Sequence, residues 1–281
     1  MNIIENIRDT KAEIKRLRQE GKSIGFVPTM GFLHEGHMSL VTKSVEENDI
    51  TVVSIFVNPT QFGPNEDLEA YPRDFERDKA MLIEAGADII FFPSPEEIYP
   101  KKYLTTVKLT GVTENLCGLS RPGHFDGVST IVCKLFNIVA PDKAYFGSKD
   151  YQQLQVIKSM VRDLDMDVEV IGMPIIREAD GLAMSSRNVY LKDAERESAL
   201  SLSKSFDLVQ KLIDEGEKDA KAIRTRIIDF ILFHKNTNVD YVELVDPQMI
   251  NSLDQIDVDF VLALAVKVGK ARLIDNKYFT I

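Results

Sequence analysis

Residues 23–37 carry the sequence SIGFVPTMGFLHEGH, in which a short apolar stretch is followed by a glycine-containing turn and two histidines. The stretch at 23–27 is apolar and short, which predicts a buried strand, and a helical stretch follows from about residue 35 to residue 48. A strand that passes directly into a helix is the first half of a βαβ unit, whose strands run parallel. This stretch therefore predicts an α/β fold.

The alternation of strands and helices continues to about residue 175. Further strands are expected at 51–57, 88–92, 143–146 and 168–171, with helices around 75–85, 128–138 and 154–164. The pattern predicts a Rossmann-like parallel sheet flanked by helices over residues 1–175. Ligands of such sheets bind beyond the carboxyl ends of the strands, so we expect the site in the segments that follow them.

The pattern changes after Pro174. Two helices are expected at about 193–215 and 220–234, and they are followed by strands near 240–245, 260–266 and 271–274. This order predicts a smaller α+β domain over residues 176–281, which we expect to cover the active site.

Composition limits the function classes. The 281 residues have a net charge of −10 and no block of lysine or arginine, so we expect no nucleic-acid partner. The apolar run at 260–266 is too short to span a membrane, and the N-terminus has no apolar signal core. Cys117 and Cys133 lack metal or redox-pair spacing, which fits a cytoplasmic protein, and Cys133 is expected to be buried.

His34 and His37 are the first candidate site residues. They lie three positions apart in a predicted helical turn and so share a face, and Gly36 between them allows a ligand to approach the backbone. A helix N-terminus attracts anions, so this pattern favours phosphate binding. A zinc pair or two surface histidines are the alternatives, although zinc proteases space their histidines four apart and no third ligand is evident.

Three more polar segments follow predicted strands or the domain junction. In FVNPTQFG (56–63), Asn58 and Gln61 offer amides, or else cap a loop. In FGSKDYQQ (146–153), Lys149 supplies a charge and Asp150 can accept from ribose hydroxyls; a lysine beside a helix cap is the alternative. In READGLAMSSRN (177–188), two serines and Arg187 form a phosphate clamp or a solvated loop.

These segments resemble a known family. HEGH at 34–37 is similar to the HxGH signature of the nucleotidyltransferase superfamily, which includes class I aminoacyl-tRNA synthetases, and the longer PTMGFLHEGH resembles the pantothenate synthetases, or pantoate–β-alanine ligases. The other segments, with YPRD at 71–74 and RPGHFDGV at 121–128, match in the same order over about residues 24–190. Ser148 departs from the pattern, because the family usually has glutamate there.

The resemblance implies ATP-dependent condensation of (R)-pantoate with β-alanine through a pantoyl adenylate, giving pantothenate, AMP and pyrophosphate. It implies that the catalytic residues are His34, His37, Lys149 and Arg187, and that pantoate and β-alanine are bound by Asn58, Gln61 and Gln153. It implies ATP contacts at Met30, Gly31, Phe32, Leu33, His34, Glu35, Gly36, His37, Gly147, Ser148, Lys149, Asp150, Ile176, Met184, Ser185, Ser186 and Arg187.

The resemblance also implies Mg²⁺ and a homodimer. Asp78 is a candidate near the magnesium, although an acidic residue at a helix N-terminus is equally well explained by the helix dipole. Arg121 is a candidate to meet phosphate or to reach across a subunit interface, and a structural role for His124 is at least as well supported as a functional one.

Other functions remain open at this point. A nucleotidyltransferase that makes a dinucleotide or CDP-linked product would need no amine site, and a silent nucleotide sensor would lack turnover. An aminoacyl-tRNA synthetase is disfavoured, because the chain is acidic and has no room for a tRNA-binding domain. A dehydrogenase is disfavoured because no G-x-G-x-x-G follows the first strand.

Overall fold

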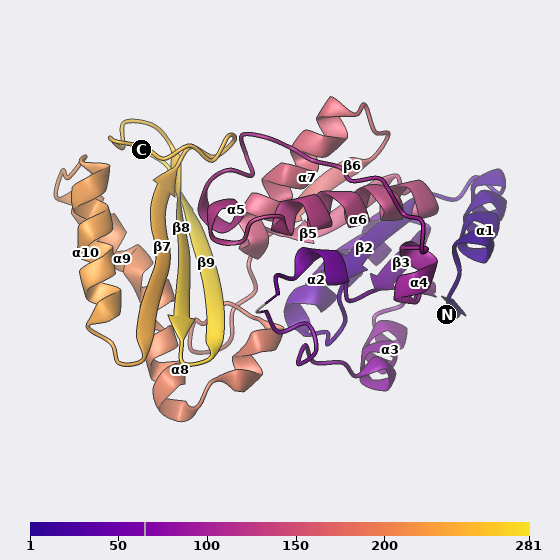
Figure 1. Cartoon of the computed structure of the whole chain (residues 1–281), viewed down its shortest axis with the longest axis horizontal. Helices are drawn as coiled ribbons and strands as arrows, with labels where there is room; N and C mark the ends of the chain where they lie inside the picture. Colours follow the sequence, from indigo (N-terminus) through magenta and orange to yellow (C-terminus); the bar gives the residue numbers. More distant parts are fainter. Residues whose placement is uncertain (65) are drawn as a thin grey trace. The chain divides into compact units, whose positions relative to one another are not determined.

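The computed structural model describes residues 1–64 and 66–281 (Figure 1). The chain divides into two compact units. The first comprises Met1–Leu109, Arg121–Ser148 and Val156–Pro174, and the second comprises Thr110–Ser120, Lys149–Gln155 and Ile175–Ile281. Two segments that precede residue 175 thus belong to the second unit. No described helix combines the length and apolar character needed to cross a lipid bilayer.

The first unit contains a six-stranded sheet in the order β1-β4-β3-β2-β5-β6, and every neighbouring pair is parallel. This confirms the predicted α/β class. Its strands are β1 (Asn2–Ile4), β2 (Ile24–Thr29), β3 (Ile50–Ile55), β4 (Ile89–Phe91), β5 (Lys143–Gly147) and β6 (Glu169–Met173). The edge strand β1 was not predicted, since its three residues are too few to show a pattern.

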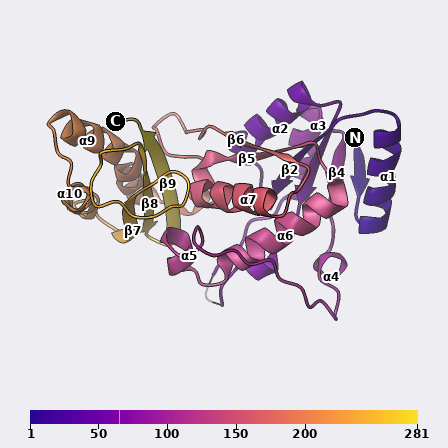
Figure 2. The same ribbon diagram turned by 90° about the horizontal axis from the view of Figure 1, so that it is seen from above.

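Helices cover both faces of this sheet (Figure 2). On one face α2 (Glu35–Glu47) and α3 (Phe75–Glu84) bury Leu40 and Leu82 against Val27 of β2. On the other face α6 (His124–Val139) places the ring of Phe136 against Phe26, with centroids 6.4 Å apart. Alternate residues of β2 thus meet opposite faces, which explains its continuous apolar sequence. The remaining helices before residue 175 are α1 (Ile7–Gln19), α4 (Pro95–Ile98), α5 (Leu116–Ser120) and α7 (Tyr151–Asp163).

One expectation about the cysteines was wrong. Cys133 lies in α6 but is only half-buried, because it falls between the apolar stripe that faces the sheet and the solvent side of the helix. Burial still raises the pKa of its thiol.

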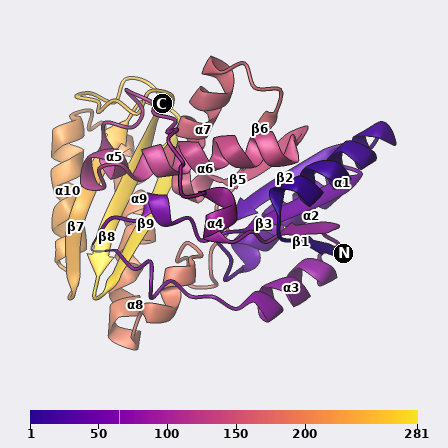
Figure 3. The same ribbon diagram turned by 45° about the vertical axis from the view of Figure 1, so that its right-hand side comes forward.

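The second unit is built on a three-stranded antiparallel sheet in the order β7-β8-β9 (Figure 3). The strands are β7 (Thr237–Val245), β8 (Phe260–Val268) and β9 (Ala271–Phe279), and the helices after residue 175 are α8 (Asp193–Ala199), α9 (Ser201–Asp214) and α10 (Ala220–Leu232). The helix α5 and the start of α7 also belong to this unit. The single helix predicted at 193–215 is therefore two helices. Leu200 has ψ −16°, near the 3₁₀ value, and interrupts the helix there.

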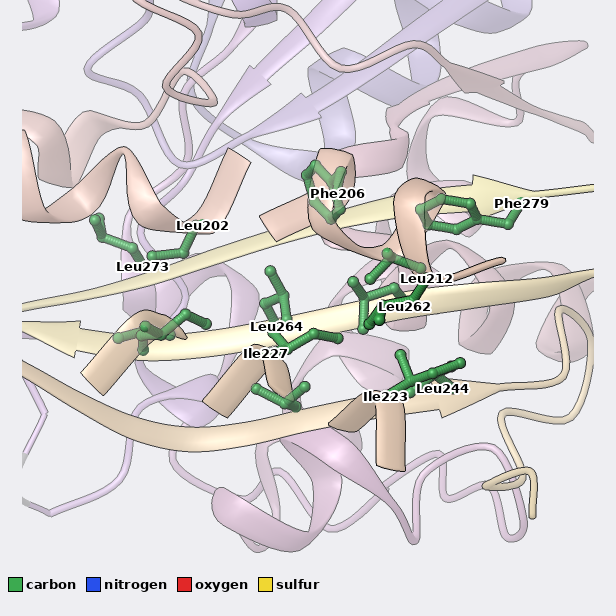
Figure 4. Close-up of a cluster of buried hydrophobic side chains, with 14 of the residues drawn as sticks. Leu202, Phe206, Leu212, Ile223, Ile227, Leu244, Leu262, Leu264, Leu273 and Phe279 are labelled. Atoms are coloured by element: carbon green, nitrogen blue, oxygen red, sulfur yellow. The ribbon is translucent and has the colours of Figure 1, made fainter. Parts of the chain in front are cut away.

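Both faces of β8 are buried. Leu262 and Leu264 pack with Phe206 of α9 and Ile227 of α10, as the close-up shows (Figure 4). The alternate residues of β8, such as Val261, pack in a separate cluster on the other face of the sheet. Burial on both sides explains why 260–266 is the purest apolar run of the chain.

Candidate active site

Three candidate segments leave the same edge of the first unit's sheet. β2 lies between β3 and β5, and all three strands run in the same direction. Thr29, the last residue of β2, is paired with Ile55, the last residue of β3. The segments that begin at Met30, Phe56 and Ser148 therefore start side by side, at the strand ends where ligands of parallel sheets bind.

The turn after β2 has a demanding backbone. Gly31 has φ 79° and Phe32 has φ 49°, and the second value is unfavourable for a residue with a side chain. Asp78 of α3 compensates, because its carboxylate accepts the N–H of Phe32 and the N–H of Leu33, each at 2.7 Å. Asp78 is only 1% exposed, and Leu33 is completely buried. The Asp78 carboxylate of α3 therefore holds in place the turn that precedes the two histidines.

The same contacts bear on the candidate magnesium ligand. Both oxygens of Asp78 are engaged by backbone amides, and burial raises the pKa of its carboxyl group. The described part of the chain contains no group of three or more His, Cys, Asp or Glu residues that could hold a metal ion. The residues present thus do not fit a magnesium site built by protein side chains, and the contacts of Asp78 are those of an anchor.

His34 and His37 lie together at the start of α2. His34 is the N-cap residue, His37 lies in the first turn, and their ring centroids are 4.0 Å apart. Both side chains are half-buried. The dipole of the helix N-terminus favours an anion at this position. Two imidazoles beside that helix end can add hydrogen bonds to phosphate oxygens.

Asn58 and Gln61 lie in the short 3₁₀ helix η1 (Pro59–Gln61) and the residue before it. The Asn58 side chain does cap this helix, as one reading of the sequence allowed, but it also holds Gln61: its Nδ2 donates to Gln61 Oε1 at 3.1 Å. Gln61 Nε2 in turn contacts the Met30 sulfur at 3.0 Å. The amide of Gln61 is thereby brought to the turn that precedes the histidines.

The backbone of η1 is clamped by α6 and the loop before it. His124 Nδ1 and Arg121 Nη2 lie 2.8 and 3.1 Å from the Gln61 carbonyl oxygen. Arg121 also pairs with Glu66, and although burial opposes ionisation, the guanidinium lowers the pKa of that carboxyl group. Arg121 and His124 therefore support Gln61 in this structure.

Gly127 allows α6 to approach η1 closely. A Cβ at position 127 would lie 2.4 Å from the carbonyl oxygen of Thr60 and 2.7 Å from the nitrogen of Gln61. Only glycine fits there without moving the backbone that carries Gln61. At Gly147, the end of β5, a Cβ would meet no atom within 4 Å.

In the second unit, two neighbouring residues of β9 hold two candidate segments. Asn276 Nδ2 donates to the carbonyl oxygen of Lys149 at 2.8 Å. Asp275 accepts two hydrogen bonds from Arg177, which directly follows the candidate Ile176. The sequence reasoning missed Asp275 and Asn276. Both side chains are buried, but β9 also contains Arg272 and Lys277, so a local pattern does not single out this pair.

The segment at 176–188 forms a structured turn. The N–H of Met184 donates to the carbonyl of Ile176 at 3.0 Å, and Ser185 Oγ accepts the N–H of Arg187 at 3.3 Å. Met184, Ser185, Ser186 and Arg187 are all half-buried. Gln153 is half-buried as well.

The comparisons with known proteins agree with one another. The chain matches the Pantoate-beta-alanine ligase family over residues 2–278. It is 59% identical over 276 residues to the pantothenate synthetase of Acetivibrio thermocellus and 56% identical over 276 residues to that of Caldicellulosiruptor bescii, in each case over 98% of both chains.

Solved structures give the same result. The chain is similar to the pantothenate synthetase of Thermus thermophilus, with a TM-score of 0.92 and 42% identity over 99% of both chains. It is also similar to the pantoate-beta-alanine ligase of Francisella tularensis, solved in complex with beta-gamma ATP and beta-alanine, with a TM-score of 0.80 and 35% identity over 99% of this chain and 97% of that one. This chain therefore belongs to the pantoate–β-alanine ligase family.

Proposed function

We propose that this chain condenses pantoate with β-alanine at the expense of ATP, giving pantothenate, AMP and pyrophosphate. The observation that carries the proposal is the paired rings of His34 and His37 at the N-terminus of α2, in a chain that matches the ligase family over nearly its whole length. The related Francisella tularensis protein, solved with beta-gamma ATP and beta-alanine, supports the choice of substrates.

The reaction has two steps. A carboxylate oxygen of pantoate attacks the α-phosphorus of ATP, and pyrophosphate leaves with the electron pair of the broken P–O bond. The amine of β-alanine then attacks the acyl carbon of pantoyl adenylate, and AMP leaves. Negative charge gathers on phosphate oxygens in the first step, so catalysis rests on positioning and on electrostatic stabilisation.

The roles of individual residues follow from that charge. His34 and His37, together with the helix dipole of α2, stabilise negative charge on the α-phosphate during the first step. Lys149 and Arg187 add positive charge. ATP contacts are assigned to residues 30–37, residues 147–150, Ile176 and residues 184–187. The open space beside Gly147 supports a ligand contact at that backbone.

Pantoate and β-alanine are assigned to Asn58, Gln61 and Gln153. A neutral amide can donate to a hydroxyl or a carboxylate oxygen without repelling the acid. The bond between Asn58 and Gln61 supports this assignment, because it holds the Gln61 amide beside Met30 in one orientation.

Three further features belong to the same proposal. Mg²⁺ accompanies ATP and is held by phosphate oxygens and water rather than by a cage of side chains. The enzyme acts in the cytoplasm, where ATP is plentiful.

The enzyme also forms a homodimer. Leu104 is a large apolar residue that is 93% exposed, so it is the surface residue to test. The test compares the sedimentation of the wild type with that of Leu104→Asp.

The proposal is tested by incubating the protein with ATP, Mg²⁺ and pantoate, with and without β-alanine, and measuring AMP and pantothenate. AMP release that depends on both pantoate and β-alanine supports the ligase. Nucleotide transfer that needs no amine would indicate the simpler nucleotidyltransferase, and absence of any turnover would indicate a nucleotide sensor.

A further inference from the structure

Asn58 is at the centre of a hydrogen-bonded chain that begins at Tyr99, in the segment after α4. The Tyr99 hydroxyl donates to Asn58 Oδ1 at 2.8 Å, and Asn58 Nδ2 donates to Gln61 Oε1 at 3.1 Å. Asn58 is 1% exposed, while Tyr99 and Gln61 are half-buried, so the centre of this hydrogen-bonded chain is shielded from solvent. Tyr99 thus lies two hydrogen bonds from the amide assigned to pantoate.

Backbone groups fix the direction, from donor to acceptor, of these hydrogen bonds. Asn58 Nδ2 also donates to the carbonyl oxygen of Gly127 at 3.1 Å, and Oδ1 faces the N–H of Thr60 at 3.4 Å. A flipped Asn58 amide would set oxygen against oxygen at Gly127, which cannot donate. The Asn58 side chain therefore accepts a hydrogen bond from Tyr99 and donates one to Gln61.

This polarity determines what Gln61 offers a ligand. Asn58 donates to Gln61 Oε1, and Gln61 Nε2, which contacts the Met30 sulfur, keeps a second N–H that can be donated to a ligand. The three groups are aligned donor to acceptor, and aligned hydrogen bonds polarise and strengthen one another. A ligand group that meets the Nε2 side of Gln61 is then an acceptor, such as a hydroxyl or carboxylate oxygen.

The position of the Tyr99 ring is itself held. Its centroid lies 6.3 Å from that of Phe56 and 5.1 Å from that of Tyr103, and Lys134 Nζ lies 5.7 Å from the Tyr99 centroid and 4.8 Å from that of Tyr103. Burial raises the pKa of the Tyr99 hydroxyl, so it remains a proton donor at neutral pH. The ring is a fixed support from which one hydroxyl reaches Asn58.

We propose that Tyr99 is a positioning residue for pantoate, which acts through Asn58 to present the Nε2 donor of Gln61 to the acid. The inference rests on the proposed ligase function, because it assigns a task to the same site. It predicts that losing the Tyr99 hydroxyl weakens the use of pantoate more than the use of ATP.

The test is Tyr99→Phe, with Tyr103→Phe as the matched control. Both variants remove one hydroxyl from the same pair of packed rings, but the Tyr103 hydroxyl hydrogen bonds with Thr130 rather than with Asn58. Tyr99→Phe should lower kcat/KM for pantoate about tenfold, which is the scale of one lost hydrogen bond. The loss should not be larger, because Thr60 Oγ1 still donates to Asn58 Oδ1 at 2.9 Å. The KM for ATP, and both constants of Tyr103→Phe, should change less than about twofold.

A double-mutant cycle with Gln61→Ala separates positioning from packing. If Tyr99 acts through Gln61, Tyr99→Phe has no further effect in the Gln61→Ala background. The inference is overturned if Tyr99→Phe leaves pantoate kinetics unchanged, if its effect persists at full size without the Gln61 amide, or if Tyr103→Phe costs as much. Any of these results with an active wild type overturns the inference alone, whereas a wild type without turnover overturns the proposed function and this inference with it.

Discussion

Arg177 and Asp275 form a two-point ion pair, in which Nη1 lies 2.7 Å from Oδ2 and Nη2 lies 2.9 Å from Oδ1. The Asp275 side chain is 2% exposed, and burial raises the pKa of its carboxyl group while Arg177 opposes that shift. Removing one partner of such a pair leaves a buried charge uncompensated. Arg177→Ala should therefore lower the free energy of unfolding by about 3–5 kcal/mol, measured by urea denaturation.

The control for Arg177 is an exposed arginine. Arg16 pairs with Glu13 and Glu20, but its side chain is 53% exposed, so Arg16→Ala should leave the urea midpoint close to that of the wild type. Adding Asp275→Asn to Arg177→Ala should recover part of the loss, because no buried charge remains. Equal free energies of unfolding for Arg177→Ala and the wild type would show that the ion pair with Asp275 does not stabilise the fold.

His37→Ala and Lys149→Ala should each lower pantoate-dependent ATP–pyrophosphate exchange at least a hundredfold while the fold is retained. One preorganised donor to developing charge contributes about 3–4 kcal/mol to transition-state stabilisation. His234→Ala, at the end of α10, is the matched control and should retain activity within about twofold. Near-normal exchange in either site variant would reject the role assigned to that side chain.

Asp78→Asn tests whether Asp78 anchors the turn or binds metal. An asparagine can accept one of the two backbone N–H groups, but its own NH₂ opposes the other. Loss of a charged acceptor should reduce stability by about 3 kcal/mol and lower exchange at least tenfold, with little change in the Mg²⁺ concentration needed for half-maximal rate. Asp74→Asn, at the exposed N-cap of α3, is the control, since asparagine also caps helices. A large rise in the Mg²⁺ requirement would favour a metal ligand instead.

Glu47 should make the first unit sensitive to acid. Hydrogen bonds from Lys43, Lys143 and the Tyr145 hydroxyl lower the pKa of Glu47 from 4.5 to about 2. Because the folded pKa is depressed, this stabilisation is fully present above the unfolded value and is lost as pH falls from about 4.5 toward 2. The urea midpoint of the wild type should exceed that of Glu47→Gln at pH 7, and the gap should close across this range. Glu46→Gln, whose side chain is 60% exposed, should follow the wild type at every pH.

The sequence was sufficient for the parallel sheet apart from its edge strand β1, and for the strand ends. Continuous apolar stretches such as 51–57 predict buried parallel strands, and the polar segments after them had to share one edge. The sequence was insufficient for α1, because this helix is rich in charged residues and Ile14 and Leu17 are its only large buried apolar side chains. The helical spacing of Ile7, Ile14 and Leu17 is present in the sequence, but these apolar residues are few among the charged ones.

The end of β9 shows a different reason for failure. The sequence predicted a strand near 271–274, yet the strand continues through Asp275 and Asn276 to Phe279. Polar side chains in a buried strand normally argue against it. Here Arg177 and the carbonyl of Lys149, which lie 98 and 127 positions away, satisfy them. Such distant partners leave no mark on a local pattern, and the same holds for Asp78 and Tyr99.

The contrast between Gly127 and Gly147 separates two kinds of constraint on this chain. A methyl group at 127 would collide with the protein's own backbone, so every variant there is expected to fail in the absence of any ligand. At 147 the protein would accept alanine without rearrangement, and under the proposed ATP contact a penalty would emerge only when ATP is added. A mutational scan scored once for abundance and once for activity would therefore assign one glycine to the architecture and the other to the nucleotide.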